Sequence, residues 1–290
     1  MLSILIPVYN YDVTELVTEL SKQCVAMRIQ FEIICLDDAS TQNCSPAIDL
    51  DHFGWVQTNE NLGRAGARNK LVSLARYDVL LFLDADMKVI EPDFIANYFK
   101  YAKENSVVCG GFVYTNVKPE NHYLLRWNYG RKYEVKIASE RAEEPFGSFM
   151  TGNFLALKSV MVSHLFDESL LIYGHEDTLF GKALLEAAVK IKHIDNPALH
   201  DGLETNEKFI EKTKEGMKSL SQLYASGKIT RHYSGVIKLY ENLRLMQLLT
   251  VTYTLIEILE SWMGKEIKSK GKKLWLFQLL KLKWFVELQK

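Results

Sequence analysis

Cysteine is scarce in this 290-residue sequence, and no two cysteines form a C-x-x-C pair. The four that occur are Cys24, Cys35, Cys44 and Cys109. Three of them fall in stretches predicted to be strands or helices, where a cysteine usually serves as a small core residue. The sequence therefore offers no cysteine motif for metal or redox chemistry, and this usage fits a reducing compartment.

Long apolar runs are also absent. No stretch reaches the roughly 18 uncharged apolar residues that a membrane-spanning helix needs. The amino terminus has no basic region before an apolar core, so we predict no signal peptide. These two absences favour a cytoplasmic protein.

The chain has almost no net charge, with a formal value of −1 at pH 7. Nothing in this balance indicates a nucleic-acid partner. The charge is unevenly distributed, because residues 265–290 contain eight lysines and two glutamates and so carry +6. The hydrophobic share of 48% and the charged share of 24% are typical of a globular chain that can bury one large domain with a smaller appendage.

Neither of the common glycine-rich phosphate motifs is present. Residues 63–69 read Gly-Arg-Ala-Gly-Ala-Arg-Asn, which lacks both the P-loop spacing and the G-x-G-x-x-G spacing. The glycines of this stretch still permit close approach of the backbone, and its arginines could reach a base or a phosphate.

A short apolar stretch followed by two acids organises the rest of the chain. Residues 79–83 are all apolar, which is typical of a strand covered on both faces, and Asp84 and Asp86 follow directly. We expect these carboxylates at the carboxyl edge of the sheet, where open α/β sheets bind ligands. Their oxygens could hold Mg²⁺ or Mn²⁺ against a diphosphate, although a solvated turn after a strand is the simpler alternative.

Strands and helices alternate through the first half, which indicates a mostly parallel sheet with right-handed crossovers. The predicted strands are 3–8, 31–36, 55–58, 79–83 and 107–113, and predicted helices include 14–27 and 92–103. The second strand also ends in paired acids, Asp37 and Asp38. One of them could accept a hydrogen bond from a nucleobase or ribose, or could cap a helix.

Four motifs in this order resemble family 2 glycosyltransferases of the GT-A fold. They are Ser-Ile-Leu-Ile-Pro-Val-Tyr-Asn at 3–10, Leu-Asp-Asp-Ala-Ser at 36–40, Asn-Leu-Gly-Arg-Ala-Gly-Ala-Arg-Asn at 61–69 and Leu-Asp-Ala-Asp at 83–86. The resemblance covers about residues 1–210. It implies a Rossmann-like mixed, mostly parallel sheet flanked by helices, with residues 1–110 as the nucleotide-sugar half and 111–210 as the acceptor half. Residues 211–290 would form a helical extension.

The resemblance also implies an inverting, metal-dependent transfer of a sugar from a nucleotide diphosphate donor. Pro7 and Tyr9 would line the base pocket, and Asp38 and Arg64 would contact the base. Asp84 and Asp86 would bind the ribose–metal–diphosphate unit, with Mn²⁺ or Mg²⁺ held directly by Asp86. The full set assigned to the donor is Pro7, Tyr9, Asp38, Gly63, Arg64, Asn69, Asp84 and Asp86.

The second half should supply the acceptor site and the base. Gly152 interrupts a predicted strand at 149–157, where it could admit a sugar ring or simply form a bulge. Glu176 and Asp177 stand before a predicted helix, where acids often only compensate the helix dipole. In the resembling family an aspartate of such a pair is the general base, so Asp177 is the predicted base, and Glu176 would bind the acceptor or orient its neighbour.

His200 is the predicted third metal ligand, because several members of the resembling family place a histidine in this region. A surface or capping role is the ordinary alternative for a lone histidine. His193 and His175 are two further candidates for the same position.

The carboxyl-terminal segment 272–290 interleaves lysines with leucine, tryptophan and phenylalanine. Such a helix fits an anionic membrane surface, and it equally fits packing on the catalytic domain or on a second subunit. The sequence thus predicts a glycosyltransferase acting on a glycan or lipid-linked glycan, at the inner face of the membrane if this segment binds there. A sugar-1-phosphate nucleotidyltransferase and a catalytically inactive sugar-nucleotide-binding module remain as alternatives.

Overall fold

The computed structural model describes residues 1–103, 106–169 and 174–290. The chain divides into two compact units. We call the first the α/β unit, which comprises Met1–Thr115, Val135–Ser169 and Glu176–Gly202. The second, the helical unit, comprises Asn116–Glu134, Leu203–Lys290 and the short stretch Leu170–His175, of which only the last two residues are described.

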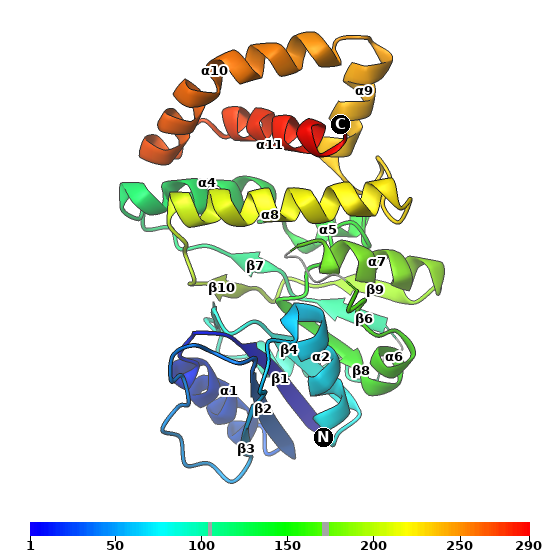
Figure 1. Ribbon diagram of the computed structural model, residues 1–290. Helices are drawn as coiled ribbons and strands as arrows, with labels where there is room; N and C mark the ends of the chain where they lie inside the picture. Colours follow the sequence, from blue (N-terminus) through cyan, green and yellow to red (C-terminus); the bar gives the residue numbers. More distant parts are fainter. Residues whose placement is uncertain (104–105, 170–173) are drawn as a thin grey trace. The chain divides into compact units, whose positions relative to one another are not determined.

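A seven-stranded sheet forms the centre of the α/β unit (Figure 1). Its strands are β1 (Leu2–Val8), β2 (Phe31–Asp37), β3 (Phe53–Gln57), β4 (Val79–Leu83), β6 (Ser106–Cys109), β8 (Asn153–Leu157) and β9 (Lys190–His193). They lie in the order β3-β2-β1-β4-β8-β6-β9. Only β8 runs antiparallel to its neighbours, so the mixed, mostly parallel sheet that the sequence predicted is confirmed.

Helices cover both faces of this sheet. They are α1 (Thr14–Ala26), α2 (Gly63–Leu74), α3 (Phe94–Phe99), α5 (Ala138–Glu143), α6 (Lys158–Ser163) and α7 (Glu176–Glu186). Alternate residues of β1 point into two separate cores, because successive side chains of a strand face opposite ways. Ile4 and Ile6 join the core beneath α1 and α3, whereas Leu5 joins the core beneath α2, α6 and α7.

A second, three-stranded sheet lies in the same unit and consists of β5 (Met87–Lys88), β10 (Ala198–His200) and β7 (Phe112–Val113). The strand predicted over 107–113 is therefore two strands, β6 and β7. The break falls at Gly110 and Gly111, and Gly111 has a φ of +83°, which extended strands do not adopt. Cys24, Cys35 and Cys109 are buried free thiols, as their apolar surroundings predicted.

The helical unit contains the 3-10 turn η1 (Asn121–Tyr123) and the helices α4 (Leu124–Tyr133), α8 (Asn206–Ala225), α9 (Gly235–Leu245), α10 (Leu249–Lys270) and α11 (Leu274–Leu288). Helices α9 and α10 are separate elements, because Gln247 adopts a φ of 60° between them. The expected boundary at residue 210 falls inside α8, and residues 116–134 group with the helices.

Of the two roles that the sequence left open for 272–290, the burial of α11 favours packing on protein. Leu276, Phe277, Leu282 and Phe285 are at most 1% exposed, and Trp284 is also buried. Helix α11 packs against α8, α9 and α10 within the helical unit. A helix that is apolar on all sides has no separate face for lipid, so it becomes the core around which the others pack. In the described part of the chain, no helix combines the length and apolarity needed to cross a bilayer.

Candidate active site

The acids predicted from the sequence lie at the carboxyl ends of neighbouring strands of the α/β unit. Val8 at the end of β1 pairs with Asp37 at the end of β2, and the backbone N–H of Asp38 donates to the Val8 carbonyl at 2.9 Å. Strand β4, which precedes Asp84, pairs with the other side of β1. Parallel strands thus bring the ends of three strands to one edge of the sheet.

Asp38 holds the loop that leads into α2. Its carboxylate accepts a hydrogen bond from the backbone N–H of Leu62 at 2.6 Å, and the hydroxyl of Thr58 lies 3.5 Å away. Burial raises the pKa of Asp38 from its usual value, while the bound N–H groups act in the opposite direction. Asp38 therefore holds the backbone at Leu62, the N-cap residue of α2, although this helix has no side-chain cap of its own.

The two residues expected to line a base pocket differ in exposure. Pro7 is half-buried within β1, and Tyr9 just beyond the strand is exposed. Next to them Asn10 has a positive φ of 51°, and its side-chain oxygen accepts from the backbone N–H of Thr41 at 2.9 Å. This contact fixes the loop after β2 beside the loop after β1.

Helix α2 begins at Gly63, whose φ of +72° suits a residue without a side chain. Arg68 of this helix is 2% exposed, and it donates a hydrogen bond through one terminal nitrogen to Asp84 and through the other to the Arg64 carbonyl. Asn69 donates to the Phe166 carbonyl and accepts from the same residue's backbone N–H, both at 3.0 Å. The amide of Asn69 is thus used to join α2 to the segment after α6.

Arg64 lies one turn before Arg68 and pairs with Glu176 at 3.1 Å. Glu176 opens α7 and is buried. Burial alone would raise its pKa, but the Arg64 and Arg68 guanidinium groups outweigh that effect and hold the pKa of Glu176 below its usual value. The structure therefore brings the predicted donor residue Arg64 together with the predicted acceptor residue Glu176.

Asp177, the predicted base, has a different environment from its neighbour. Burial, followed by the negative charge of Glu176, raises the pKa of Asp177 to about 6. One carboxylate oxygen accepts from the backbone N–H of Thr178 at 2.7 Å. A carboxylate with a pKa near neutrality can hold and release a proton at working pH, which is what general base catalysis requires.

Gly152 makes room for the Asp84 carboxylate. A Cβ at position 152 would lie 2.9 Å from Oδ2 of Asp84 and 3.0 Å from the ring of Phe112. The Gly152 carbonyl also accepts from the backbone N–H of Asp84 at 3.1 Å. The glycine thus permits a close approach to the acid itself.

Asp86 faces His200 across the small sheet. Nε2 of His200 lies 3.6 Å from Oδ2 of Asp86, and the imidazole stacks on Tyr114 with ring centroids 5.1 Å apart. The opposite nitrogen, Nδ1, is buried and has no hydrogen-bond partner among the residues that the structure describes. Gly202 lies so close that an added Cβ would be 2.6 Å from the Cβ of Asp86.

This pair fits a divalent cation. The 3.6 Å separation is below the roughly 4.2 Å that two ligand atoms with bonds of about 2.1 Å to one Mg²⁺ can span. Carboxylate oxygen and imidazole nitrogen are both ligands of Mn²⁺-type ions. Within the described ranges, however, no three histidine, cysteine or acidic side chains cluster closely enough to form a complete metal site. Asp84, the third expected ligand, accepts a hydrogen bond from Arg68 through one of its two carboxylate oxygens.

His193 is engaged elsewhere. Its Nε2 lies 2.9 Å from the Pro145 carbonyl and its Nδ1 lies 3.2 Å from a guanidinium nitrogen of Arg141. Both ring nitrogens therefore have protein partners. His175 precedes Glu176 with a φ of 72°.

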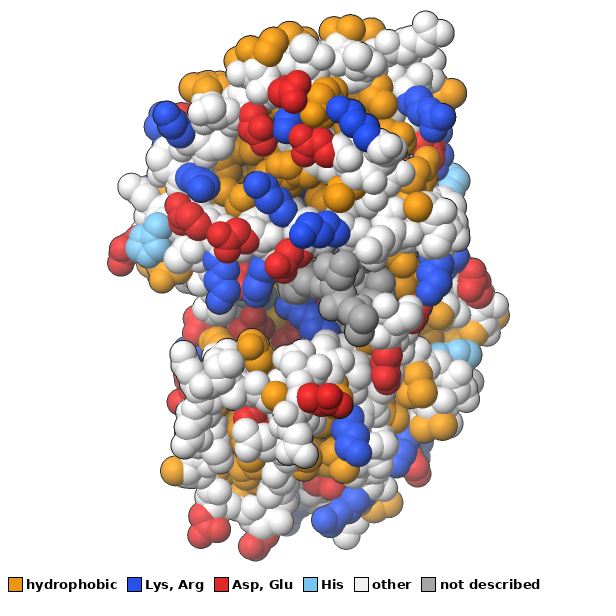
Figure 2. All heavy atoms as spheres, in the orientation of Figure 1, with side chains coloured by type: hydrophobic (Ala, Val, Ile, Leu, Met, Phe, Trp, Pro, Cys, Tyr) orange, Lys and Arg blue, Asp and Glu red, His pale blue; other side chains and the backbone are white. Residues whose placement is uncertain are grey.

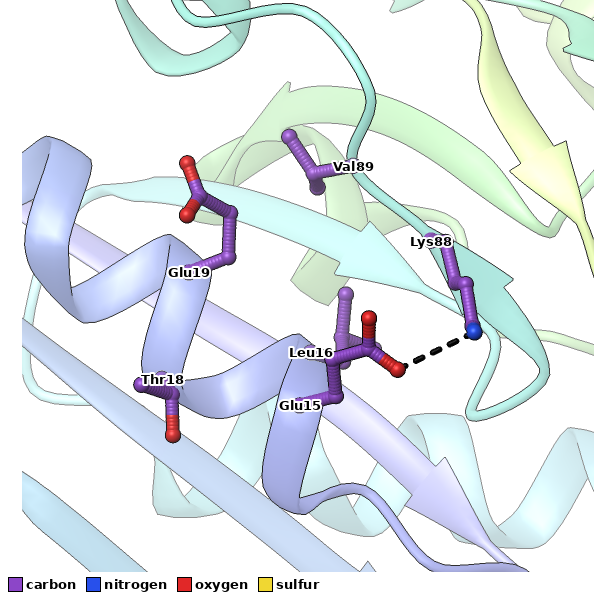
Figure 3. A pocket seen from close by; sticks show the side chains of 6 residues that line it. All are labelled: Glu15, Leu16, Thr18, Glu19, Lys88 and Val89. Atoms are coloured by element: carbon purple, nitrogen blue, oxygen red, sulfur yellow. Dashed lines mark ion pairs between the residues drawn. The ribbon is translucent and has the colours of Figure 1, made fainter.

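A hollow of about 290 Å³ lies beside α1 and is lined by Glu15, Leu16, Thr18, Glu19, Lys88 and Val89 (Figure 3). Lys88 spans from Glu15 at 3.0 Å to Asp201 at 3.1 Å. The backbone N–H of Asp201 donates to the Asp86 carbonyl, so these contacts tie the strands that carry Asp86 and His200. The lining contains none of the predicted donor or acceptor residues.

The sequence pointed to the arginines of 63–69 but not to the contact of Arg68 with Asp84, and it missed Gly202. Arg68 could have been singled out, because Arg64 and Arg68 are four residues apart and share one face of a helix. Gly202 gave no signal, since its contact with Asp86 depends on the pairing of β5 with β10, far apart in sequence.

Comparison with known proteins places these residues in context. The model of a family described as "Glycosyl transferase family 2" matches residues 3–161, more than half of the chain. An uncharacterized glycosyltransferase, YfnE of Bacillus subtilis (strain 168), is 24% identical over 275 residues, covering 77% of this chain and 70% of that protein. The hyaluronan synthase of Pasteurella multocida is 28% identical over 201 residues, covering 57% of this chain and 21% of the synthase.

Two solved structures share the fold. The mannosyltransferase PcManGT from Pyrobaculum calidifontis, in complex with GDP-Man and Mn²⁺, aligns with a TM-score of 0.61 at 14% identity, covering 99% of this chain and 86% of that one. The glucosyl-3-phosphoglycerate synthase of Mycobacterium tuberculosis, in complex with Mg²⁺ and UDP, aligns with a TM-score of 0.52 at 14% identity, covering 78% of each chain.

Proposed function

Because this chain belongs to glycosyl transferase family 2, we propose that its α/β unit transfers a sugar from a nucleoside diphosphate donor to a hydroxyl group with inversion at the anomeric carbon. The chain is a glycosyltransferase with the GT-A type of fold that its motifs predicted. The donor class, the inversion and the metal dependence are parts of the proposal. The family assignment disfavours the nucleotidyltransferase and the inactive binding module.

The observation that carries the proposal is the ion-pair arrangement along α2. Arg68 contacts Asp84 after β4, and Arg64 contacts Glu176 at the start of α7. One helix thereby contacts both the predicted donor end of the site and Glu176, the neighbour of the predicted base. The raised pKa of Asp177, about 6, gives that residue the protonation behaviour of a base.

In the proposed reaction Asp177 accepts the proton of the acceptor hydroxyl as its oxygen attacks. The new bond forms between that oxygen and the anomeric carbon, while the bond from this carbon to the diphosphate oxygen breaks. Glu176, held by Arg64, orients the neighbouring carboxylate. The proton ends on Asp177, and the nucleoside diphosphate leaves with the bonding electrons.

Asp86 and His200 would hold Mn²⁺ or Mg²⁺, with the remaining ligands supplied by the donor and by water. When bound, such an ion supplies Lewis-acid stabilisation of the negative charge on the departing diphosphate. The expected base contacts of Pro7, Tyr9 and Asp38 belong to the same proposal, as does a glycan or lipid-linked acceptor. A cytoplasmic location is consistent with the buried free thiols.

The test is a donor screen. UDP-, GDP- and dTDP-sugars are incubated with the full chain and Mn²⁺, and release of the nucleoside diphosphate is measured with the Asp177→Asn variant as the control. We expect slow release from one donor class that the variant lacks. Equal release by both proteins would contradict the assignment of the base, and release of pyrophosphate from a nucleoside triphosphate with a sugar phosphate would favour a nucleotidyltransferase.

A further inference from the structure

A row of large apolar side chains lies on the exposed side of α10, in the helical unit. Val251, Leu255, Ile258 and Trp262 are 59%, 56%, 72% and 49% exposed. Their spacing of four, three and four residues places them on one face of the helix. The buried residues of α10 are Ile256, Met263 and Ile267, so this helix buries one face in its own unit and exposes a second apolar face.

The row continues past the amino end of α10. Leu245 and Met246 at the end of α9 are 76% and 68% exposed, and Leu248 and Leu259 are exposed as well. We call the whole set the apolar stripe: Leu245, Met246, Leu248, Val251, Leu255, Ile258, Leu259 and Trp262. Hydrophobic side chains gather along this edge of the helical unit, over α10, in Figure 2. An exposed row of large apolar side chains on one helix face is typical of an interaction site.

The charged side chains near the stripe are unevenly distributed along the helix. Residues 245–262 contain two charged side chains, Glu257 and Glu260, and Glu260 pairs with Lys283 at 3.1 Å. The next stretch, 265–273, holds five exposed lysines and a single acid, Glu266, which gives +4. Glu266 pairs with both Lys270 and Lys273, at 3.0 Å each. The apolar stripe thus ends beside a basic patch.

Two exposed tryptophans lie at the junction of these surfaces. Trp262 is the last member of the stripe, and Trp275 near the start of α11 is 58% exposed. Lys273 lies over the Trp262 ring, 5.4 Å from its centroid. Tryptophan and lysine together are typical of the boundary between lipid headgroups and acyl chains.

A second copy of this chain is a poorer match for the surface. In a parallel arrangement of two α10 helices the lysines would face lysines. In an antiparallel arrangement they would face the Leu245 end, where Arg244 is exposed. Anionic headgroups complement the +4 patch, and the acyl boundary complements the stripe.

We propose that the apolar stripe and the lysines of 265–273 dock the helical unit on an anionic lipid surface. The stripe enters the headgroup–acyl boundary, and the lysines contact anionic headgroups. This surface runs from the end of α9 along α10 to the lysines just before α11 and does not include the buried residues of α11. The proposal goes beyond the transfer reaction.

Co-sedimentation of the full chain with vesicles tests the proposal without measuring activity. One set of vesicles is phosphatidylcholine alone, and the other also contains phosphatidylglycerol. We expect binding to the anionic vesicles that weakens as salt is raised. The Lys265→Gln, Lys268→Gln pair should weaken binding about 30-fold, because each lysine near such a surface contributes about a fivefold factor.

Matched variants separate this surface from general attraction. Lys208 and Lys218 are exposed on α8, so the Lys208→Gln, Lys218→Gln pair removes the same charge elsewhere and should leave binding nearly unchanged. The Leu255→Ser, Ile258→Ser pair should weaken binding at least about tenfold through lost apolar burial, with an unchanged thermal melt because both side chains are exposed.

Three results would overturn the proposal. The first is no binding of the full chain to either kind of vesicle. The second is an equal loss in the two lysine pairs. The third is a dimer in sedimentation experiments that the Leu255→Ser, Ile258→Ser pair dissociates while vesicle binding stays unchanged, which would assign the stripe to a second copy.

Discussion

The two acidic pairs of the α/β unit, one after β4 and one at the start of α7, are held in the same way. The first acid of each pair binds an arginine of α2. Asp84 accepts from Arg68, which is almost fully buried, and Glu176 pairs with Arg64 at 3.1 Å. The two arginines are one helical turn apart, so a single helix fixes both pairs.

The second acid of each pair has different surroundings. Asp86 faces His200 at 3.6 Å, which suits a shared cation, whereas Asp177 has a pKa raised to about 6 by burial and by the charge of its neighbour. The comparison shows that the two acids of each pair have different partners, and that the partners are distributed in the same way in both pairs. Under the proposed function, an arginine-bound acid positions each pair, and the following acid would act as a metal ligand in one and as a base in the other.

The largest expected effect tests the metal side of this comparison. Asp86→Ala should abolish transfer, because loss of the cation removes several kcal/mol of transition-state stabilisation, which corresponds to about a thousandfold or more in rate. The fold should survive, since Asp86 is only half-buried at the sheet edge. Turnover with Mn²⁺ and thermal melts of both proteins provide the measurement. Normal turnover of the variant in EDTA would break the comparison.

The base side is tested by Asp177→Asn, which keeps the size of the side chain but cannot accept the proton. Turnover should fall by roughly 10²–10⁴-fold with donor affinity nearly unchanged. In the native chain the logarithm of turnover should rise with pH up to about 6 and then level off, because Asp177 must be ionised to act. The variant should lose this limb of the pH profile.

A third variant tests how closely Asp84 must be held. Gly152→Ala would place a Cβ 2.9 Å from the Asp84 carboxylate, so either the acid or the strand must move. A displacement of about 1 Å near the reacting groups can cost about 10²-fold in turnover. Steady-state kinetics with melting curves distinguish a displaced acid from a destabilised fold. An unchanged rate would show that the position of Asp84 is not critical.

The smallest expected effect concerns Arg64. Its positive charge lowers the pKa of both Glu176 and Asp177, so Arg64→Gln should shift the acidic limb of the pH profile to higher pH. Arg64→Lys retains the charge and serves as the control with a profile close to that of the native chain. A profile that does not move in the Gln variant would mean that Arg64 has no influence on the base.

The sequence predicted the sheet and its acidic edge well, because both depend on patterns between residues that are close together in the sequence. Residues 79–83 form a strand buried on both faces, and a pattern of that kind leaves no other stable arrangement for Asp84 than the strand end. Similarly, the alternation of strands and helices fixed the parallel connections up to β4. Antiparallel β8 could not be anticipated in the same way, because its partners β4 and β6 are distant in sequence.

The carboxyl-terminal helices show the opposite outcome. The lysines of segment 272–290 are interleaved with aromatic residues, yet α11 is the core of its unit. Lys283 itself is buried and pairs with Glu260 and Glu287. The less conspicuous α10 carries the exposed stripe. Composition alone cannot distinguish these helices, since burial depends on which neighbour covers which face.

The sequence pointed to the residues of the predicted donor site but not to the side chains that contact them. Arg64 was expected to contact the base, and the structure pairs it with Glu176, more than a hundred residues away. Asn69, assigned to the donor, holds Phe166 and Glu168 instead. Such pairings arise from the packing of α2 against segments that are distant in sequence, so they cannot be predicted from the spacing of residues in a motif.

The most direct test of the different roles proposed for Asp86 and Asp177 is calorimetric titration of the chain with the donor nucleotide in the presence of Mn²⁺. The account predicts that Asp86→Asn loses the Mn²⁺-dependent part of nucleotide binding, whereas Asp177→Asn binds the nucleotide as the native chain does and loses only turnover. If Asp177→Asn abolishes Mn²⁺-dependent binding and Asp86→Asn retains it, the roles of the two acids are reversed and the account is wrong.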